Sequence, residues 1–359
     1  MNIRAIIVVF AAFSLSSCYR EESRNRYIIA MEDINFKQLE GKLVVKGDDD
    51  LTIAHELLIV DSLCILINST ERGGIFRVYD IENFNKARSF GEIGQGPNDF
   101  LAPPFFISTR ENDGFSVIDR IQARIVEFCN ANRDSIHITS TREILPLLHS
   151  SNVNQIDENL FIGTKSLSAN GLFFMYDYSQ DVMEWISYTT RHSRNLRGHR
   201  NRMYISFLRA NKDRNLIVCA LRFFNRIVFF DFDGNHVKEI QIGYRELTPE
   251  WQREWNMVSM SSTTYFLDMC TTTEHIYILW VNAFFDEIGE FIRRDPAKVF
   301  VFNWEKELVS ALQLDKPISR IAVSEDGSML LGLADDGTGL TDVIKYDLRS
   351  ILSTQNELF

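Results

Sequence analysis

The chain has 359 residues, of which 45% are hydrophobic and 12% aromatic, and this composition excludes an intrinsically disordered protein. Its formal net charge of −11 argues against nucleic acid as a partner, because phosphate binding requires a basic face. The same charge argues against electrostatic binding to an anionic membrane surface.

Residues 1–17 are predicted to be a signal peptide. Arg4 supplies a positive charge, and the apolar run Ala5–Leu15 is too short to span a bilayer as a stable anchor. The next residues, Leu15–Cys18 (LSSC), resemble a bacterial lipobox, in which a lipoprotein signal peptidase cleaves before a cysteine that carries lipid. The resemblance implies that lipid on Cys18 attaches the protein to a membrane. The alternative is an ordinary secretory signal with a chance cysteine.

Residues 18–32 are predicted to form a flexible tether. Its charged start, Tyr19–Arg26 (YREESRNR), resembles the surface-export signal of Bacteroidetes lipoproteins. A plain solvated linker explains the same residues equally well. We therefore expect an outer-membrane lipoprotein of the bacterial cell envelope, either periplasmic or surface-exposed.

Residues 33–359 are predicted to fold as one all-β domain. Short runs of β-branched and aromatic residues recur, whereas helical periodicity is almost absent. One phrase, an alternating run that ends in Asp or Asn, occurs at Ile75–Asp80, Arg124–Asn130, Leu172–Asp177, Arg226–Asp231, Lys298–Asn303 and Asp342–Asp347. The spacing matches the four-stranded blades of a propeller, and a β-sandwich would not require the same phrase six times. The sequence therefore predicts a six-bladed β-propeller.

The Asp or Asn at the end of each run predicts a tight turn, because its side chain can bond the backbone that follows. Each run is therefore expected to be the third strand of a blade and to lead into the fourth. In the last blade, only a weak strand pattern follows Asp342–Asp347. We expect the N-terminal segment Gly41–Gly47 (GKLVVKG) to supply the missing strand and close the ring, which removes an open sheet edge.

The connection between blades one and two, Ser89–Pro103 (SFGEIGQGPNDFLAP), is rich in Gly and Pro. It lacks the Lys and Ser/Thr of a phosphate-binding loop, and no helix follows it as a dinucleotide-binding fingerprint requires. We predict a structural loop in which Gly94 and Gly96 adopt positive φ and Asp99 caps backbone amides. Phe100 is expected to be buried between the two blades.

The same stretch resembles the FGxxGQGPxEF signature of the six-bladed, TolB-like propeller lipoproteins of Bacteroidetes. The matching positions are Gly91, Gly94, Gln95, Gly96, Pro97, Asp99 and Phe100. Pro97 cannot donate to a ladder, so strand pairing should stop there. Asp99 replaces the usual Glu of the family, which keeps the carboxylate on a shorter side chain. The resemblance implies a propeller fold and an envelope location, and it implies no particular ligand or activity.

The sequence carries no recognised catalytic or metal-binding motif. It has neither HExxH nor GxSxG, and Asp231–Glu239 lacks the acidic spacing of a calcium loop, which indicates a hairpin turn. Cys64, Cys129, Cys219 and Cys270 lie in apolar runs without CxxC spacing, so buried free thiols are favoured over disulfides. We expect no cofactor and no metal.

Long connections on one face of the predicted disc are the candidate ligand site. Residues 191–202 concentrate arginines, and Thr248 and Pro249 resemble the start of a short helix that carries two tryptophans. Arginine forks and tryptophan faces suit an acidic glycan or an acidic peptide. The predicted ligand-binding residues are Gln95, Asn98, Arg194, Arg197, Arg200, Trp251 and Trp255.

Two function classes remain open. The favoured one is a non-enzymatic module that holds a glycan, peptide or protein partner on its loop-rich face. The alternative is a hydrolase or lyase that acts on sugars or lactones around a central metal, because unrelated six-bladed propellers host such chemistry. The arginines could instead pair with the acidic residues Glu246, Glu250 and Glu254, which would leave no free site.

Overall fold

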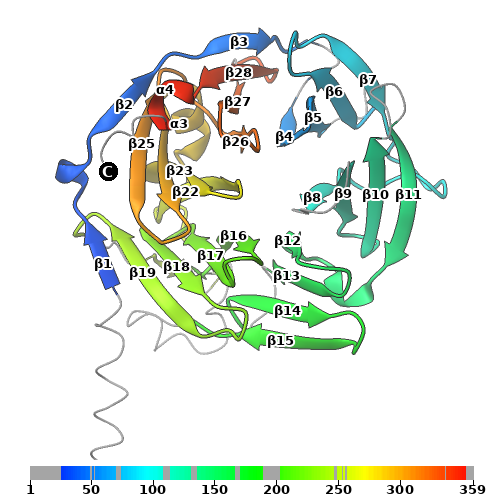
Figure 1. The fold of residues 1–359 in the computed structure, drawn as a ribbon, viewed down its shortest axis with the longest axis horizontal. Coiled ribbons are helices and arrows are strands. Elements are labelled where there is room, and N and C mark those ends of the chain that lie inside the picture. Colours follow the sequence, from blue (N-terminus) through cyan, green and yellow to red (C-terminus); the bar gives the residue numbers. More distant parts are fainter. Residues whose placement is uncertain are drawn as a thin grey trace, which may run out of the picture.

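The computed structural model describes residues 26–48, 51, 53–69, 74–107, 114–130, 136–165, 170–188, 203–245, 249–252, 254, 257–335 and 337–352. These residues form six blades arranged around a central axis, as Figure 1 shows. The predicted signal peptide and Cys18 lie outside the described residues.

The first three blades each contain four antiparallel strands, ordered from the axis outward as they follow in the chain. Blade one consists of β4 (Ala54–Val60), β5 (Leu63–Asn68), β6 (Phe76–Asp80) and β7 (Lys86–Phe90). Blade two consists of β8 (Phe105–Ile107), β9 (Gly114–Asp119), β10 (Arg124–Asn130) and β11 (Ile136–Glu143). Blade three consists of β12 (Ser151–Gln155), β13 (Leu160–Thr164), β14 (Phe173–Asp177) and β15 (Val182–Ile186).

The last three blades follow the same order and receive strands from the N-terminus. Blade four consists of β16 (Ser206–Asn211), β17 (Leu216–Leu221), β18 (Arg226–Phe230) and β19 (His236–Ile242). Blade five consists of β22 (Thr263–Thr271), β23 (His275–Phe284), β24 (Lys298–Asn303) and β25 (Leu308–Leu314). Blade six consists of β26 (Arg320–Val323), β27 (Met329–Asp335), β28 (Thr341–Asp347) and β3 (Lys42–Val45).

The six recurrent runs of the sequence form the third strands of the six blades, as predicted. At Asp177 and Asp231, the terminal side chain also forms the expected turn. The Asp177 carboxylate accepts the backbone N–H groups of Ser179 and Gln180 at 2.9 and 3.1 Å. The Asp231 carboxylate accepts the backbone N–H of Asn235 at 2.8 Å within a hairpin, which confirms the turn predicted over this segment.

The N-terminal segment wraps around the outside of half the ring. We call β1 (Arg26–Ile29), β2 (Phe36–Leu39) and β3 together the strap. β1 and β2 add in parallel to the outer strands of blades four and five, whereas β3 pairs antiparallel with β28. The predicted closure by an N-terminal strand is therefore confirmed. The predicted tether over residues 18–32 is too long, because its last residues include β1.

A buried polar cluster fixes the start of the strap. The Glu239 carboxylate lies 2.7 Å from Arg26 Nε and 3.0 Å from Arg226 Nη1, and Tyr188 donates its hydroxyl to the same carboxylate at 2.8 Å. Arg226 is only 3% exposed, so losing its partner would leave a buried charge unpaired. The cluster therefore ties the strap to blade four at the point where the described chain begins.

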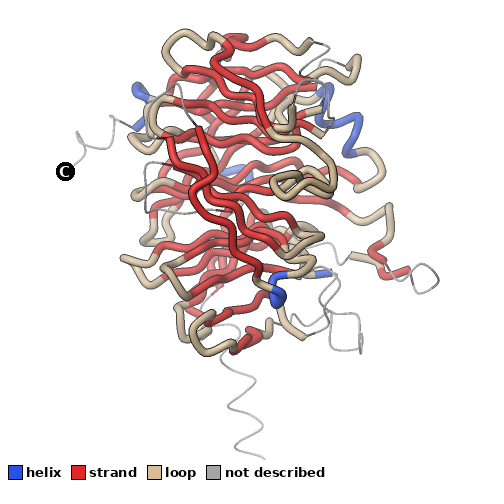
Figure 2. The backbone as a smooth tube through the Cα atoms, turned by 90° about the vertical axis from the view of Figure 1, so that its right-hand side faces the viewer, coloured by secondary structure: helices blue, strands red, loops and turns tan. Residues whose placement is uncertain are grey.

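The connections between strands gather at the two faces of the disc, as the side view in Figure 2 shows. The motif face carries the connections from each fourth strand to the next blade and from each second strand to the third. The turn face carries the remaining connections. Apolar side chains fill the space between neighbouring blades, as Phe76, Phe100, Phe115 and Phe128 do between blades one and two.

Short helices occur only outside the blades in the described chain: η1 (Met31–Asp33), η2 (Leu145–Leu147), α3 (Ile288–Arg294) and α4 (Arg349–Leu352). None of the described helices is long and apolar enough to cross a membrane. The helix predicted to start near Thr248 and Pro249 is wrong. Trp251 instead begins a small hairpin of β20 (Trp251–Gln252) and β21 (Met257–Val258), and its side chain packs against the core near blade four.

Candidate functional site

The motif between blades one and two folds into a tight loop on the motif face. Gly94 donates its backbone N–H to the carbonyl of Phe100, and Phe100 donates its own to the carbonyl of Glu92, both at 3.0 Å. The Asp99 carboxylate accepts the backbone N–H of Gly96 at 2.7 Å, which confirms the predicted cap. Phe100 is 1% exposed and contacts Phe76 edge to face, which confirms its burial between the blades.

The two glycines of the motif are required for a different reason than the one predicted. Neither Gly94 nor Gly96 has positive φ, whereas Gly91 does, at +79°. A Cβ atom on Gly94 or Gly96 would approach Asp99 Oδ2 more closely than real Cβ atoms approach any atom. The glycines are therefore needed because the capping carboxylate packs directly against the backbone.

Blade two holds the motif from the other side. The Arg124 guanidinium donates to the backbone carbonyls of Pro97 and Asp99 and lies 5.3 Å from the centre of the Phe100 ring. The buried Asp119 carboxylate accepts the backbone N–H of Leu101 at 3.1 Å. The motif is therefore a clasp between two blades, and its contacts support a structural role.

Of the seven predicted ligand-binding residues, Arg194, Arg197, Arg200 and Trp255 lie outside the described residues. Gln95 and Asn98 are exposed at the tip of the motif. Trp251 is half-buried in the connection between blades four and five, so it lies three blades away from the motif around the ring. The described members of the predicted site therefore do not form one compact group. Cys64, Cys129, Cys219 and Cys270 are free, as predicted; Cys129 and Cys270 are only partly buried.

A cluster of charges that the sequence analysis missed lies where the innermost strands approach the axis. We call Arg120, Arg209, Arg222 and Arg320 the arginine mouth. Arg209 and Arg320 lie on innermost strands, and Arg120 and Arg222 directly follow the second strands of their blades. All four residues are half-buried. Arg209 and Arg320 interact electrostatically with the Glu56 carboxylate, Arg120 also acts on Glu56, and Arg222 acts on Arg320.

Backbone carbonyls and aromatic rings hold these guanidinium groups. Arg320 donates to the carbonyls of His55 and Ser319 at 3.0 and 2.8 Å, and Arg209 donates to its neighbour Leu208 at 2.8 Å. The Arg120 guanidinium lies 3.7 Å from the centre of the Phe105 ring, and that of Arg222 lies 5.0 Å from the Phe285 ring. Burial lowers the pKa of both Arg120 and Arg222.

In the part of the chain that the structure describes, the carboxylates that lie near the four arginines are those of Glu56 and Asp268. Both oxygens of Asp268 accept backbone N–H groups, from Met269 and Ile321, each at 2.9 Å. No guanidinium of the arginine mouth lies within 4.0 Å of a carboxylate of the described chain. Even with both carboxylates ionised, the four guanidinium groups leave this cluster with an excess of positive charge in a protein whose net charge is −11.

Glu56 and His55, on the innermost strand of blade one, titrate far from their ordinary ranges. Burial raises the pKa of Glu56 to about 7, with Arg320 opposing the shift and Asp268 adding to it. Burial also lowers the pKa of His55 to about 4, and Arg320 and Arg120 act in the same direction. His55 is therefore neutral near pH 7. Its Nε2 donates to the carbonyl of Pro104 at 3.2 Å, which leaves Nδ1 to accept from the Ser69 hydroxyl.

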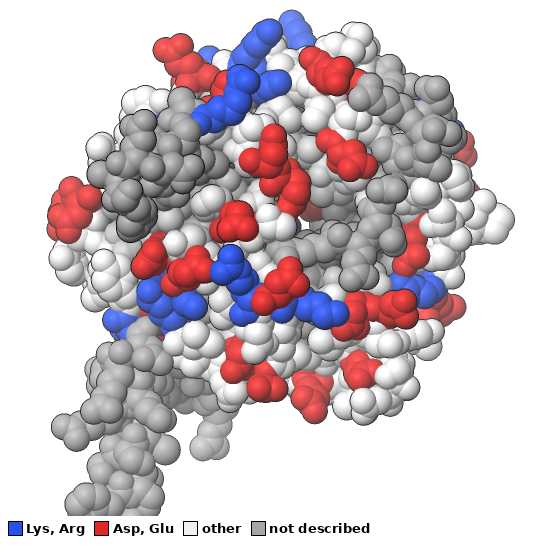
Figure 3. All heavy atoms as spheres, in the orientation of Figure 1, with Lys and Arg blue, Asp and Glu red and all other residues white. Residues whose placement is uncertain are grey.

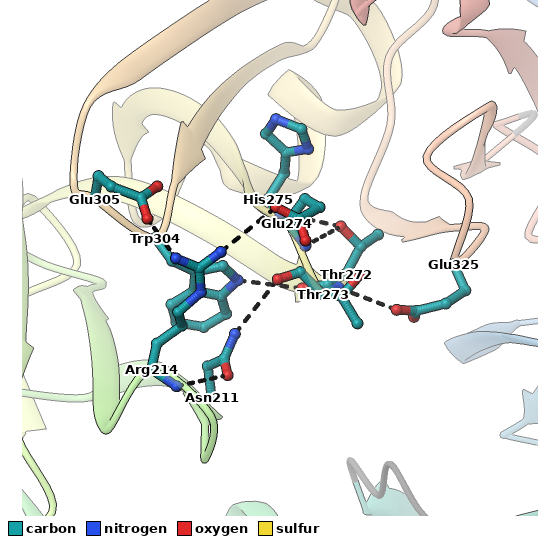
Figure 4. A network of polar contacts seen from close by, with 9 residues as sticks. All are labelled: Asn211, Arg214, Thr272, Thr273, Glu274, His275, Trp304, Glu305 and Glu325. Carbon is teal, nitrogen blue, oxygen red and sulfur yellow. Dashed lines mark hydrogen bonds and ion pairs between the residues drawn. The ribbon is translucent and has the colours of Figure 1, made fainter.

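On the turn face, by contrast, arginine side chains form ion pairs with carboxylates. In the network drawn in Figure 4, Arg214 pairs with Glu305 at 2.6 Å and with Glu274 at 3.6 Å. Glu325 reaches across from blade six to accept the backbone N–H of Thr273 at 3.0 Å. Figure 3 shows basic and acidic side chains interleaved around the hollowed centre of the visible face. Arg214 therefore has carboxylate partners, unlike the guanidinium groups of the arginine mouth.

Within the described residues, no group of three or more His, Cys, Asp or Glu side chains is placed to hold a metal ion. The chemistry available at the arginine mouth is therefore the recognition of negative charge, because guanidinium N–H groups form bidentate hydrogen bonds with carboxylate, phosphate and sulfate. The low dielectric of a half-buried site strengthens such contacts.

Similarity to known proteins is consistent with this fold. The family model described as TolB-like 6-blade propeller-like matches residues 38–326. A DUF4221 family member from Bacteroides vulgatus superposes with a TM-score of 0.54 at 11% identity, over 87% of this chain and 98% of that one. A predicted exported protein from Bacteroides fragilis has the same TM-score at 8% identity, over 89% and 98%. No curated protein matches the sequence of this chain.

The clasp predicts a clear stability effect. We expect Gly94→Ala and Gly96→Ala each to destabilise the fold by roughly 1–3 kcal/mol, because the added methyl group displaces the Asp99 carboxylate from its cap. Gly289→Ala is the matched control, since it lies in α3 with nothing within 4 Å of an added Cβ. Urea unfolding monitored by tryptophan fluorescence measures all three. Equal stability of the motif variants and wild type would contradict the clasp.

The buried carboxyl predicts a pH-dependent stability difference. Because the folded-state pKa of Glu56 is raised, its stabilising contribution is present below its ordinary pKa and is lost as pH rises towards about 7. Glu56→Gln should therefore gain melting temperature relative to wild type between pH 5 and pH 8. Glu305→Gln, at an exposed carboxylate, should show a constant difference over that range. A pH-independent difference for Glu56→Gln would show that the carboxyl is not perturbed.

Proposed function

The chain belongs to the TolB-like family of six-bladed propellers, and from this premise we propose that it is a binding module that holds an anionic ligand at the arginine mouth. The observation that carries the proposal is the presence of four half-buried arginines without a carboxylate ion-pair partner in the described chain. In a protein of net charge −11, such a cluster is a local exception that requires an explanation.

The surroundings of the arginine mouth favour the capture of a ligand. Arg120 and Arg222 are partly buried and have already lost part of their hydration shell. An anion that binds them therefore has less water to displace from the guanidinium groups. The Nε atom of Arg222 is buried and has no hydrogen-bond partner. Because the protein as a whole carries a net charge of −11, the local positive charge of the arginine mouth favours this position for an anion. An acidic glycan or an acidic peptide, the ligand classes expected from the sequence, both supply the required charge.

The alternative of a hydrolase or lyase with a central metal finds little support in the donor set of this site. Both oxygens of Asp268 already accept hydrogen bonds, and the guanidinium groups around Glu56 would repel a cation. The raised pKa of Glu56 is the one feature that a general acid or base would share. Binding without catalysis therefore remains the function that the geometry supports best.

The anion site predicts a charge-specific loss of binding. Arg120→Gln with Arg222→Gln should weaken binding of a rhodamine-labelled hexaglutamate peptide at least tenfold, because two of the four donors are lost. Arg214→Gln with Arg293→Gln removes the same charge from residues that pair with carboxylates, and it should leave affinity nearly unchanged. Fluorescence anisotropy at two salt concentrations measures both. If the two double variants behave alike, the peptide binds to net charge and the proposal fails.

The location proposed for this module is the bacterial cell envelope, with attachment through lipid on Cys18. The lipobox-like segment Leu15–Cys18 supports the attachment, and the similar fold of a predicted exported protein from Bacteroides fragilis supports the location. The strap fits this arrangement, because β1 begins only a few residues after the proposed lipid and is tied to blade four through Glu239. The disc would then sit close to the membrane that holds it.

The anchor predicts a change of cell fraction. The Cys18→Ser variant should lose incorporation of labelled palmitate and leave the membrane fraction, because the acylated thiol is absent. Cys64→Ser, at a buried thiol of blade one, serves as the control and should remain labelled. Metabolic labelling followed by fractionation measures both. Labelled, membrane-bound Cys18→Ser protein would show that the lipid is carried elsewhere.

A further inference from the structure

Beside the arginine mouth, four aliphatic side chains are exposed on the motif face of blade two. They are Leu101, Ile121, Leu145 and Leu148, and we call them the aliphatic patch. Leu145 is 65% exposed and Ile121 is 49% exposed. Single exposed aliphatic residues are ordinary, whereas several that adjoin each other indicate an interaction surface.

Hydrogen bonds show that the chain segments that carry these residues adjoin each other. The Asp119 carboxylate accepts the backbone N–H groups of both Leu101 and Ile121, at 3.1 and 2.9 Å. The segment that contains Leu145 and Leu148 is bonded on either side of Ile121. Its residues 144 and 149 donate to the carbonyls of residues 123 and 120 at 2.8 and 3.0 Å. Three chain segments therefore converge on one small area.

The fold does not account for this exposure. Within the same segment, Ile144 and Leu147 are 1% and 0% exposed and already supply the apolar contacts of the core. Leu145 and Leu148 alternate with them and face outward, where polar residues would cost the fold nothing. The aliphatic patch therefore contributes to something other than the packing of the blades.

The aliphatic patch adjoins the arginine mouth through Arg120. Arg120 directly precedes Ile121, its carbonyl accepts the backbone N–H of His149, and its guanidinium lies over the Phe105 ring and acts on Glu56. One ligand could thus place apolar groups on the aliphatic patch and a negative charge in the arginine mouth. A ligand that must carry both apolar groups and a negative charge belongs to a narrower chemical class than an anion in general.

We propose that the ligand is a polypeptide segment in which aliphatic side chains lie next to an acidic residue or a free C-terminal carboxylate. This inference rests on the proposed function and specifies its ligand. A glycan has no aliphatic side chains and prefers aromatic rings, none of which belong to the aliphatic patch. An acyl chain requires an enclosed groove, whereas these side chains are exposed. An anionic membrane would meet the whole face of a protein of net charge −11, whereas a short peptide meets only the arginine mouth and the aliphatic patch.

Three labelled peptides test the inference by fluorescence anisotropy: rhodamine-LVLVEE with a free C-terminus, rhodamine-LVLVQQ with an amidated one, and rhodamine-SGSGEE. We expect wild type to bind LVLVEE at least tenfold more tightly than either of the others. The amidated LVLVQQ lacks the negative charges, and SGSGEE lacks the aliphatic side chains. Ile121→Ser with Leu145→Ser should weaken LVLVEE binding about tenfold and leave SGSGEE binding unchanged.

Two further variants make the outcomes distinguishable. Leu43→Ser with Val182→Ser removes aliphatic side chains of similar exposure, 47% and 45%, from outer strands and should bind like wild type. Arg120→Gln with Arg222→Gln should weaken both LVLVEE and SGSGEE. If only the arginine variant changes affinity, the proposed function holds and the peptide inference is overturned. If neither variant changes affinity, both fail.

Vesicle sedimentation distinguishes a peptide ligand from a membrane. Wild-type protein without its lipid should not sediment with vesicles of 30% phosphatidylglycerol. Sedimentation that disappears in Ile121→Ser with Leu145→Ser would assign the aliphatic patch to the membrane and overturn the inference. Circular dichroism of every variant confirms folding, which exposed serine substitutions should not disturb.

Discussion

The structure depends on how the innermost strand of each blade satisfies its free edge. β4, β8, β12, β16, β22 and β26 each have a neighbouring strand on one side only, and their other edge faces the axis. Unpaired backbone groups at such an edge require partners. At β16, β26 and β4, a side chain from the adjacent blade provides such a partner: Asn154 donates to the carbonyl of Leu208 at 3.1 Å, Asp268 accepts from the backbone N–H of Ile321, and Arg320 donates to the carbonyl of His55.

This requirement explains why charged residues gather at the centre of a protein whose blades are otherwise packed by apolar side chains. A long side chain that bonds across to the next blade carries its charge to the axis, where those of the other blades also arrive. Arg320 both ties blade six to blade one and contributes to the arginine mouth. The same residues therefore join neighbouring blades and create the local positive charge that favours an anionic ligand. At the outer rim the strap has the corresponding task for blades four to six.

Much of the fold could be predicted because short, local sequence patterns specify most of its strands. The six alternating runs with a terminal Asp or Asn identify the third strands, and the position of Lys42–Val45 before blade one indicates the closing strand. The parallel additions of β1 and β2 carry no such local signal. The helix predicted near Trp251 failed because that side chain packs into the core, and tertiary packing overrides a capping pattern. The motif glycines were recognised, but their reason lies in the approach of the Asp99 carboxylate, which only the folded loop reveals.

The arginine mouth could not be found from the sequence because its members are single polar residues on different blades. Arg120 and Arg320 lie two hundred residues apart in the sequence. The residues around each of them resemble those at any strand end and give no sign of a binding site. The most direct measurement of the central claim is anomalous diffraction from a crystal soaked in selenate, a sulfate analogue. The account predicts a selenium peak among the guanidinium groups of Arg120, Arg222 and Arg320. Selenate bound elsewhere on the protein with none at these groups would contradict it.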